Sequence, residues 1–286
     1  MEKKLQEQLR FFLKREMKYK LIVSDFDDTI VDDTQNVSEE TIRAIQDFES
    51  RGGKFVLCTG RMISAILPHA RKIGLKGDVI GYQGAVVADI ESGKFKVEHA
   101  IPMDKALKVA KFLEDRDLYF QLYEDDTFVI REENEFSLLY RGFTFLPPKI
   151  LGKSLSEYIV SKSLAPTKIL IINKPERIPS ILEMMEREFG EELLVNSSKR
   201  FMVEIVPRGI DKGSALKDLA NSLNIPLNEV IAVGDGLNDI PMLTSGAFPI
   251  AVANAHSKLK EYAKDIAPKC TEEPIKWIIE KYCNNT

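Results

Sequence analysis

Asp25 and Asp27 stand two positions apart at the end of an apolar run, residues 20–25. If that run is a strand, both side chains can lie at its carboxyl-terminal edge, where open α/β sheets bind ligands. One carboxylate can then attack an electrophile while the other moves a proton, and together they can hold a hard cation. Acidic residues also follow strands in ordinary turns, so this pair alone does not decide the function.

Two further segments contain groups that suit a phosphate ligand. Thr59 and Gly60 follow a second apolar run at residues 55–58, and a hydroxyl beside a glycine amide suits phosphate oxygens. Lys212 begins a predicted helix, where its charge adds to the attraction of the helix N-terminus for anions. Taken singly, the first segment also fits a helix N-cap and turn, and the lysine fits a solvated surface position.

A fourth segment follows the apolar run of residues 229–233 and contains Asp235, Asn238 and Asp239. Its glycines permit a tight turn, and two carboxylates with an amide between them can form a cation-binding loop. An isolated loop of this kind can be an ordinary turn. Four such segments in this order are much harder to explain as separate turns, so they point to a single site.

The elements that must position these groups alternate between short apolar strands and amphipathic helices. Strands are predicted at residues 20–25, 55–58, 78–81, 229–233 and 249–252. Helices are predicted between them, over about 38–50, 61–74, 212–223, 239–243, from 257 and over 272–282. This alternation predicts a Rossmann-like parallel sheet with helices on both faces, which is an α/β fold.

Between these halves the pattern changes to strand pairs that alternate with helices. Residues 86–131 and 167–205 each predict strands with one helix, which favours an α+β insert with a mainly antiparallel sheet. The predicted organisation is an amphipathic helical extension at 1–16, a core domain formed by 17–84 and 207–286, and a cap domain at 85–206.

Composition limits the possible partners and the compartment. The formal net charge of −4 argues against a nucleic-acid partner. No apolar stretch approaches the roughly 20 residues of a membrane span, and the odd set Cys58, Cys270 and Cys283 argues against a disulfide framework and for the cytoplasm. Cys58 is predicted to be a core residue.

Taken together, the four segments resemble the motifs of the haloacid dehalogenase superfamily of phosphohydrolases, in its Cof-type branch with a large α/β cap. The resemblance covers nearly the whole chain from about Met17. The segments that carry it are Asp25-Phe-Asp27-Asp28-Thr29, Thr59-Gly60-Arg61, Glu204-Ile-Val-Pro207 through Lys212-Gly213, and Gly234-Asp-Gly-Leu-Asn-Asp239.

The resemblance implies a role for each motif residue. Asp25 would attack phosphorus and form an aspartyl-phosphate, while Asp27 would protonate the leaving alcohol and then activate water. The implied phosphate ligands are Thr59, Gly60, Lys212 and Asn238. The implied Mg²⁺ ligands are the Asp25 and Asp235 side chains and the Asp27 carbonyl, with Asp239 in support through water or Lys212.

Two positions depart from the pattern of the family. Asp28 stands where Cof-type proteins usually have glycine, and Gln83 stands in Gln83-Gly84-Ala85 where relatives often have Asn-Gly-Ala. Acidic residues occur at the first position in other branches of the superfamily, so activity is still expected. The second departure is expected to alter contacts of the substrate or of the hinge at the entry to the cap.

The resulting hypothesis is a Mg²⁺-dependent phosphatase of small phosphorylated metabolites, such as sugar phosphates or pyridoxal phosphate. Two alternatives stay open: a phosphomutase on the same fold, which returns the phosphoryl group to the sugar, and a regulatory protein without catalysis. The cap is expected to choose the substrate, but its sequence does not name that substrate and does not reveal the oligomeric state.

Overall fold

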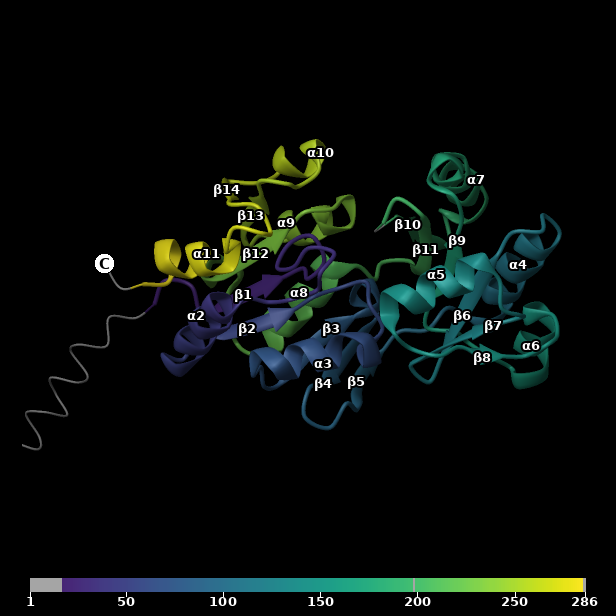
Figure 1. Ribbon diagram of the computed structural model, residues 1–286, viewed down its shortest axis with the longest axis horizontal. Helices are drawn as coiled ribbons and strands as arrows, with labels where there is room; N and C mark the ends of the chain where they lie inside the picture. Colours follow the sequence, from purple (N-terminus) through teal and green to yellow (C-terminus); the bar gives the residue numbers. More distant parts are fainter. Residues whose placement is uncertain (1–16, 198, 285–286) are drawn as a thin grey trace, which may run out of the picture.

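The computed structural model describes residues 17–197 and 199–284, which form two lobes side by side (Figure 1). The first lobe contains both ends of the described chain, and the second is formed by its middle part. The extension predicted at residues 1–16 lies outside the described residues. No helix within the described residues is long and apolar enough to cross a membrane.

The core of the first lobe is a five-stranded sheet with the order β14-β13-β12-β1-β2. Every pair in it is parallel, as predicted. Its strands are β1 (Leu21–Ser24), β2 (Lys54–Leu57), β12 (Val230–Gly234), β13 (Phe248–Val252) and β14 (Asp265–Ala267). Because β1 lies between β2 and β12, the direction of strand addition reverses beside it, which is where open α/β sheets place their binding crevice.

Amphipathic helices cover this sheet on both faces. They are α2 (Glu39–Ser50), α3 (Ile63–Ile73), α8 (Lys212–Ser222), α9 (Ile240–Leu243), α10 (Ser257–Lys260) and α11 (Pro274–Tyr282), with short 3₁₀ turns η1 (Tyr82–Gly84), η3 (Leu227–Glu229) and η4 (Leu237–Asp239). Ser38 caps the start of α2 by accepting from the Thr41 amide, and Gly74 ends α3 at a φ of 87°.

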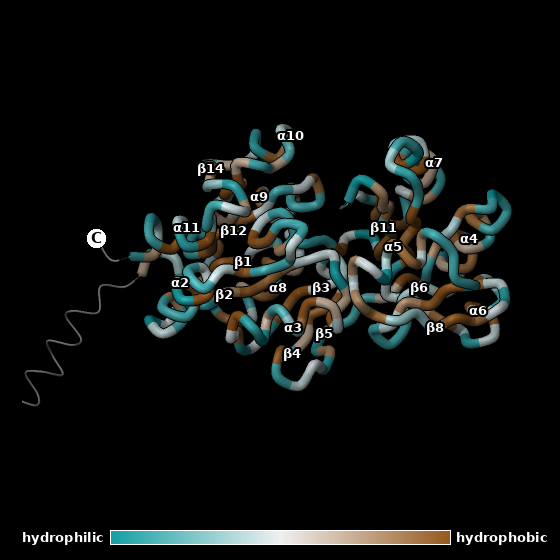
Figure 2. Tube along the Cα trace, in the orientation of Figure 1, coloured by the Kyte–Doolittle hydropathy of each residue, from teal (hydrophilic) through white to brown (hydrophobic). Residues whose placement is uncertain are grey.

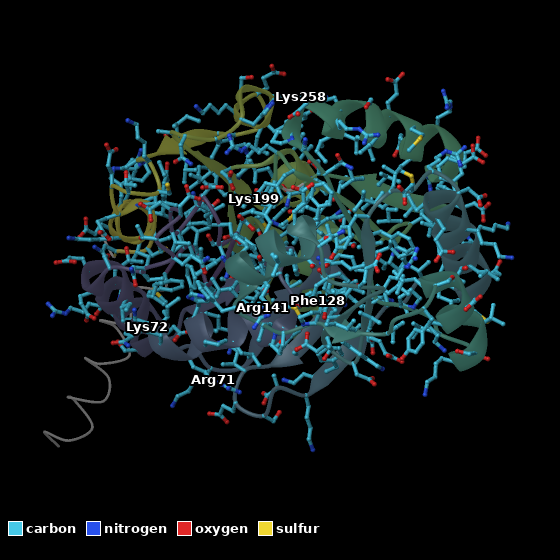
Figure 3. The ribbon with its side chains drawn as sticks, turned by 45° about the vertical axis from the view of Figure 1, so that its right-hand side comes forward. Arg71, Lys72, Phe128, Arg141, Lys199 and Lys258 are labelled. Carbon is cyan, nitrogen blue, oxygen red and sulfur yellow. The ribbon has the colours of Figure 1, made fainter. Side chains whose placement is uncertain are left out.

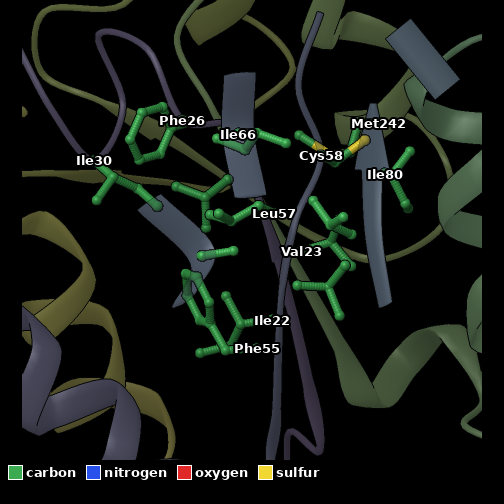
Figure 4. Packing of buried hydrophobic residues seen from close by; sticks show 14 of the residues in the cluster. Ile22, Val23, Phe26, Ile30, Phe55, Leu57, Cys58, Ile66, Ile80 and Met242 are labelled. Carbon is green, nitrogen blue, oxygen red and sulfur yellow. The ribbon is translucent and has the colours of Figure 1, made fainter. Parts of the chain in front are cut away.

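Apolar side chains fill the space between the sheet and the helices. Phe26, Phe55 and Leu57 lie in this interior, and Cys58 lies close to Met242 (Figure 4). The Cys58 thiol is fully buried, which confirms its predicted place in the core. Figure 2 shows the same division along the chain, with hydrophobic strands inside each lobe and hydrophilic turns on the outside.

A small antiparallel sheet continues the first lobe beyond β2. It contains β3 (Asp78–Gly81), β4 (Val86–Asp89) and β5 (Phe95–Glu98), and a parallel bridge between Cys58 and Ile80 joins it to the main sheet. The sequence predicts that the cap begins at residue 85, whereas β4 and β5 pair with β3 in the first lobe. The connection through η1 is short, and a short connection favours an antiparallel neighbour.

The second lobe contains a six-stranded sheet with the order β10-β11-β9-β6-β7-β8. Only the pair β7–β8 is parallel among its described pairings, which confirms the predicted α+β insert. Its strands are β6 (Phe120–Glu124), β7 (Thr127–Ile130), β8 (Lys149–Ile150), β9 (Ile169–Ile172), β10 (Leu193–Asn196) and β11 (Met202–Pro207). Its helices are α4 (Met103–Glu114), α5 (Glu135–Thr144), α6 (Leu155–Lys162) and α7 (Ile178–Phe189), with the 3₁₀ turn η2 (Pro175–Arg177).

The two faces of the cap sheet have different partners. Along β11, Val203 and Ile205 belong to a cluster shared with α4, α6 and α7. Met202 belongs to the cluster shared with the first lobe, and Glu204 hydrogen-bonds to Gln83 there. Because side chains alternate along a strand, one face of the sheet builds the cap's own core while the other is turned toward the first lobe.

Candidate active site

The four predicted segments meet at one edge of the parallel sheet. Residues of three of them line one pocket at the junction of the two lobes: Asp25, Asp27, Thr59, Gly60, Asp235 and Asn238. The cap contributes Tyr140, Phe143, Lys168 and Lys199 to the same pocket.

Lys212 lies beneath this pocket, at the first position of α8. Its ammonium group donates to Asp25 Oδ1 at 2.5 Å and to Asp239 Oδ1 at 2.6 Å, and its side chain is fully buried. Burial opposes the charge, but the carboxylates of Asp239 and Asp25 raise the pKa of Lys212 well above its ordinary value. Lys212 is therefore a permanent cation against the carboxylate of Asp25.

Three acids surround that cation. Single carboxylate oxygens of Asp25, Asp235 and Asp239 lie within 4.8 Å of one another. Burial, with repulsion among these carboxylates, raises the pKa of Asp25 to about 7 and that of Asp235 to about 9. One lysine does not balance the carboxylates of the buried Asp25 and Asp239 and the partly buried Asp235, so the cluster favours an additional cation.

The oxygens of these acids are not equally available. Asp239 Oδ1 accepts from Lys212 at 2.6 Å, and Asp239 Oδ2 accepts from the backbone amides of Asp235 and Gly236, both at 2.9 Å. Asp235 Oδ1 accepts from Thr29 at 3.0 Å. Asp239 therefore shapes the loop and holds Lys212, while Asp25 and Asp235 each keep an oxygen without a hydrogen-bond donor from the described residues.

Asp27 is held by Arg61. The guanidinium donates to Asp27 Oδ2 at 2.8 Å and to Oδ1 at 2.6 Å, and it also reaches Gln35 Oε1 at 3.1 Å. Burial would raise the pKa of Asp27, but the hydrogen bonds and charge of Arg61 bring it below its ordinary value. The rings of Phe26 and Phe143 lie 5.1 and 4.8 Å from the guanidinium carbon.

Gly60 is packed too closely for a side chain. A Cβ at this position would collide with the amide of Gln83, and the Gly60 carbonyl accepts from Lys168 at 2.9 Å. The neighbouring Thr59 hydroxyl oxygen accepts from the Arg61 amide at 3.2 Å. The turn after β2 is thus held by Lys168 of the cap and by the backbone amide of Gln83, which donates to the Thr59 carbonyl at 3.1 Å.

Gln83 joins both lobes through a buried polar network. Its carbonyl oxygen accepts from Asn238 at 3.1 Å, its amide nitrogen donates to Glu204, and Glu204 pairs with Lys168 at 3.1 Å. The Lys168 and Glu204 side chains are 1% and 3% exposed. Gln83, which stands where relatives often have asparagine, therefore connects η1 to both the cap and Asn238.

Asp28 occupies a conformation that favours glycine, with a φ of 59°. Its carbonyl accepts from Asn254 at 2.6 Å, and its carboxylate pairs with Lys199 of the cap at 2.5 Å (Figure 3 labels Lys199). The backbone geometry gives a physical reason for the usual glycine in relatives. The acid present here adds an ion pair between the lobes.

Several pocket residues were not identified from the sequence. Arg61 lies in the motif segment Thr59-Gly60-Arg61, whose resemblance implies no role for it, and its position directly after Thr59-Gly60 is the available signal. Lys168, Lys199 and Tyr140 had none, because they lie on cap segments whose approach to the first lobe is a matter of tertiary structure. Glu204 also lies in a motif segment, but the resemblance implies no role for it.

Comparison with known proteins places this geometry in a family. Residues 22–279 match the haloacid dehalogenase-like hydrolases. A phosphatase of Bacillus subtilis is 29% identical, with 85% of this chain and 93% of that protein covered. A 5-amino-6-(5-phospho-D-ribitylamino)uracil phosphatase of the same organism is 24% identical, with 93% and 98% covered. A crystal structure from Thermotoga maritima is 27% identical, with 93% and 98% covered and a TM-score of 0.80.

Proposed function

This chain belongs to the haloacid dehalogenase-like hydrolases, in their Cof-type branch, and is a phosphatase of phosphate monoesters; from that premise we propose that it hydrolyses small phosphorylated metabolites through a phosphoryl group carried on Asp25. The observation that carries the proposal is the hydrogen bond from the buried Lys212 to the Asp25 carboxylate, at the carboxyl-terminal edge of the parallel sheet. Sugar phosphates and similar monophosphates are the proposed substrates.

Asp25 has the geometry of a nucleophile. Oδ1 accepts from Lys212, while Oδ2 accepts no hydrogen bond from the described residues, and Asp25 lines the pocket. In the proposed first step, a bond forms between Asp25 and phosphorus as the bond from phosphorus to the leaving oxygen breaks. Water then attacks phosphorus and frees the Asp25 carboxylate.

Asp27 is proposed to move the protons. It is ionised while Arg61 holds it, which is the state needed to accept a proton from the attacking water. Its earlier role, protonation of the leaving oxygen, requires uptake of a proton and the loss of a hydrogen bond to Arg61. The pairing with Arg61 therefore favours the base form between turnovers.

The phosphate oxygens would be held by the Thr59 hydroxyl, the Gly60 amide, Lys212 and Asn238. The Thr59 oxygen accepts from the Arg61 amide, which leaves its hydroxyl hydrogen to donate toward the pocket. Asn238 uses one amide hydrogen on Gln83 and retains the other. These groups place hydrogen-bond donors around the substrate phosphate, which the Asp25 carboxylate must approach.

The donor set fits Mg²⁺, which prefers oxygen ligands. Asp25 and Asp235 each retain an oxygen for it, and the Asp27 carbonyl is the proposed third protein ligand, while Asp239 acts through Lys212. The cation would reduce the repulsion between the Asp25 carboxylate and the substrate phosphate. The excess of buried carboxylate charge supports this proposal independently of the family.

The first experiment is phosphate release from a panel of phosphorylated metabolites, with Mg²⁺ and with EDTA. We expect release that requires Mg²⁺ and that Asp25→Asn lowers at least about a thousandfold, because the variant loses the nucleophile at nearly constant shape. Asp27→Asn is expected to bind phosphate and turn over slowly. Full activity of Asp25→Asn would contradict the covalent mechanism.

The same panel tests the alternatives. A phosphomutase would convert one sugar phosphate to its isomer without releasing phosphate, and a regulatory protein would do neither. The retention of Asp25, Asp27, Lys212 and Asp235 around one pocket favours catalysis over a regulatory role. A cytoplasmic location is also proposed, and the free thiols of all three cysteines support it.

A further inference from the structure

Tyr140 is a cap side chain that reaches the same pocket as Asp25 and Asp27. It lies on α5 and is 3% exposed. Its ring packs edge-on against Phe128 with centroids 5.0 Å apart, and edge-on against Tyr123 at 6.5 Å. Packing on both rings fixes the position of the Tyr140 hydroxyl before any ligand arrives.

A chain of hydrogen bonds determines how that hydroxyl is used. Tyr119 donates to the carbonyl oxygen of Gln121 at 3.1 Å, the Gln121 amide donates to the Tyr123 hydroxyl at 2.8 Å, and Tyr123 donates to the Tyr140 hydroxyl at 2.6 Å. A tyrosine has one hydroxyl hydrogen. The Tyr140 oxygen thus accepts from Tyr123, and its own hydrogen has no acceptor among the described residues.

The surroundings of the Tyr140 hydroxyl keep its hydrogen in place. Burial raises the pKa of Tyr140, the charge of Glu204 adds to the rise and that of Arg61 opposes it. Both charges line the pocket beside Tyr140. The hydroxyl consequently stays protonated at working pH and is a donor, and a buried donor without a partner is costly unless a ligand supplies one.

We propose that Tyr140 is a specificity-determining residue that donates a hydrogen bond to an oxygen of the substrate's leaving group. The assignment rests on the proposed phosphatase function and narrows its substrates to esters whose leaving group carries a hydroxyl, ring or carbonyl oxygen. Phe143 and Met202 line the same pocket and offer apolar contact to the carbon skeleton. A polyol or sugar phosphate meets both requirements.

The test compares two substrates on the full chain with Mg²⁺. One is the sugar or polyol phosphate that the unchanged protein hydrolyses fastest, and the other is phenyl phosphate, whose leaving group has no oxygen besides the ester oxygen. We expect Tyr140→Phe to lower kcat/KM about tenfold for the first, because a hydrogen bond to a buried group is lost. For phenyl phosphate, kcat/KM should change less than about twofold, which also shows that the variant is folded.

Tyr158→Phe is the matched control. Tyr158 is also a 3% exposed cap tyrosine with a hydrogen-bonded hydroxyl, but it lies on α6 in the cap's own core. Its loss should not change the ratio of kcat/KM values between the two substrates. An equal fall for both substrates with Tyr140→Phe, or no fall for either, would overturn the assignment. If the unchanged protein hydrolyses neither substrate, the proposed phosphatase function fails as well.

Discussion

The aspartates near Lys212 have the same side chain but different roles. Asp239 spends both oxygens on Lys212 and on two backbone amides, whereas Asp235 has only Thr29 as a donor within the described residues. Asp27, only two residues from Asp25, is neutralised by Arg61. The number of hydrogen bonds that each carboxylate already accepts therefore decides its role. An aspartate with both oxygens occupied supports the structure, and one with a free oxygen can bind a cation or a substrate.

The raised pKa values of Asp25 and Asp235 predict how metal-free protein responds to pH. Because these values, about 7 and about 9, exceed the ordinary 3.8, the folded state keeps protons that the unfolded chain loses. This contribution to stability is present at low pH and is lost as pH rises toward 9.

Mg²⁺ should reverse that loss, because a cation replaces the protons. We expect the rise in Tm on adding Mg²⁺ to be larger at pH 8 than at pH 6, measured by thermal unfolding against EDTA. Asp235→Asn should reduce the difference between the two pH values. A Tm increase that is the same at both pH values would contradict the prediction.

Gln83 gives a second prediction at this scale. Gln83→Leu leaves Glu204 and Asn238 each without one buried partner, so we expect the free energy of unfolding to fall by about 1–3 kcal/mol. Asn238 should also hold phosphate less well, with a severalfold rise in the inhibition constant of inorganic phosphate. Gln46→Leu is the control for the inhibition constant, because the Gln46 amide lies outside the pocket lining and donates to the Ile73 carbonyl. An unchanged inhibition constant in Gln83→Leu would count against the network.

At the scale of elements, α3 lacks a cap from its own chain segment. Its N-cap residue, Met62, offers no side-chain hydrogen bond. Asp126, in the turn between β6 and β7 of the cap, accepts from the amides of Ile63 at 2.9 Å and Ser64 at 2.6 Å, and from Tyr82 at 2.8 Å. The helix that follows the Thr59 turn is thus completed by the other lobe.

Replacing Asp126 with alanine should destabilise the protein by about 1–2 kcal/mol, as the loss of a helix cap does. Asp125→Ala is a close control, because Asp125 is exposed in the same turn and its φ of 50° matches the 54° of Asp126. Urea unfolding measures both variants. If both variants lose the same stability, the loss comes from the turn backbone and not from the hydrogen bonds of Asp126 to the start of α3.

Four strands of the parallel sheet, β1, β2, β12 and β13, could be predicted because each is an apolar run followed by a polar turn. Residues 131–167 gave no such signal, yet they form α5, β8 and α6. β8 has two residues and β14 has three, too few for a periodic pattern. The pairing of β4 with β3 was also missed, because pairing depends on how the chain turns at η1 and not on the strand residues.

At the scale of the molecule, the lobes meet through polar contacts around the pocket. Lys199 and Asp28 form the most exposed of those described above, with side chains 19% and 41% accessible. Lys168 and Glu204 pair with each other inside the cap and bond to Gly60 and Gln83 of the first lobe, and both side chains are nearly inaccessible. Solvent screening weakens the first pair and not the second, so the two contacts should differ in their response to salt.

Lys199→Ala should therefore have a small effect that depends on salt. A partly exposed ion pair that solvent can screen contributes about 0–1 kcal/mol, so we expect KM to rise no more than about fivefold at low ionic strength and the difference to vanish near 1 M salt. Steady-state kinetics at several salt concentrations measure this. Lys258→Ala removes the same charge from an exposed residue outside the pocket lining and should leave KM unchanged.

The sequence predicted the residues that lie on the parallel sheet and placed them near one another, since strand ends meet at one edge of such a sheet. It did not predict which of them pair. The clamp of Arg61 on Asp27 and the Tyr123–Tyr140 contact depend on side-chain directions. Lys168 reaches Gly60 from 108 positions away, a separation at which local patterns contain no information.

The contacts of Lys168 and Glu204 also bear on whether caps can be exchanged between relatives. Separate lobes joined by a short linker suggest modules that recombination could swap to create new selectivity. Here the cap strands hold the Gly60 carbonyl and the linker glutamine, so a foreign cap would have to arrive with a matching lysine and carboxylate. A transplanted cap without them would leave the Gly60 carbonyl and the Gln83 amide without these partners, so the two lobes must be inherited as a matched pair.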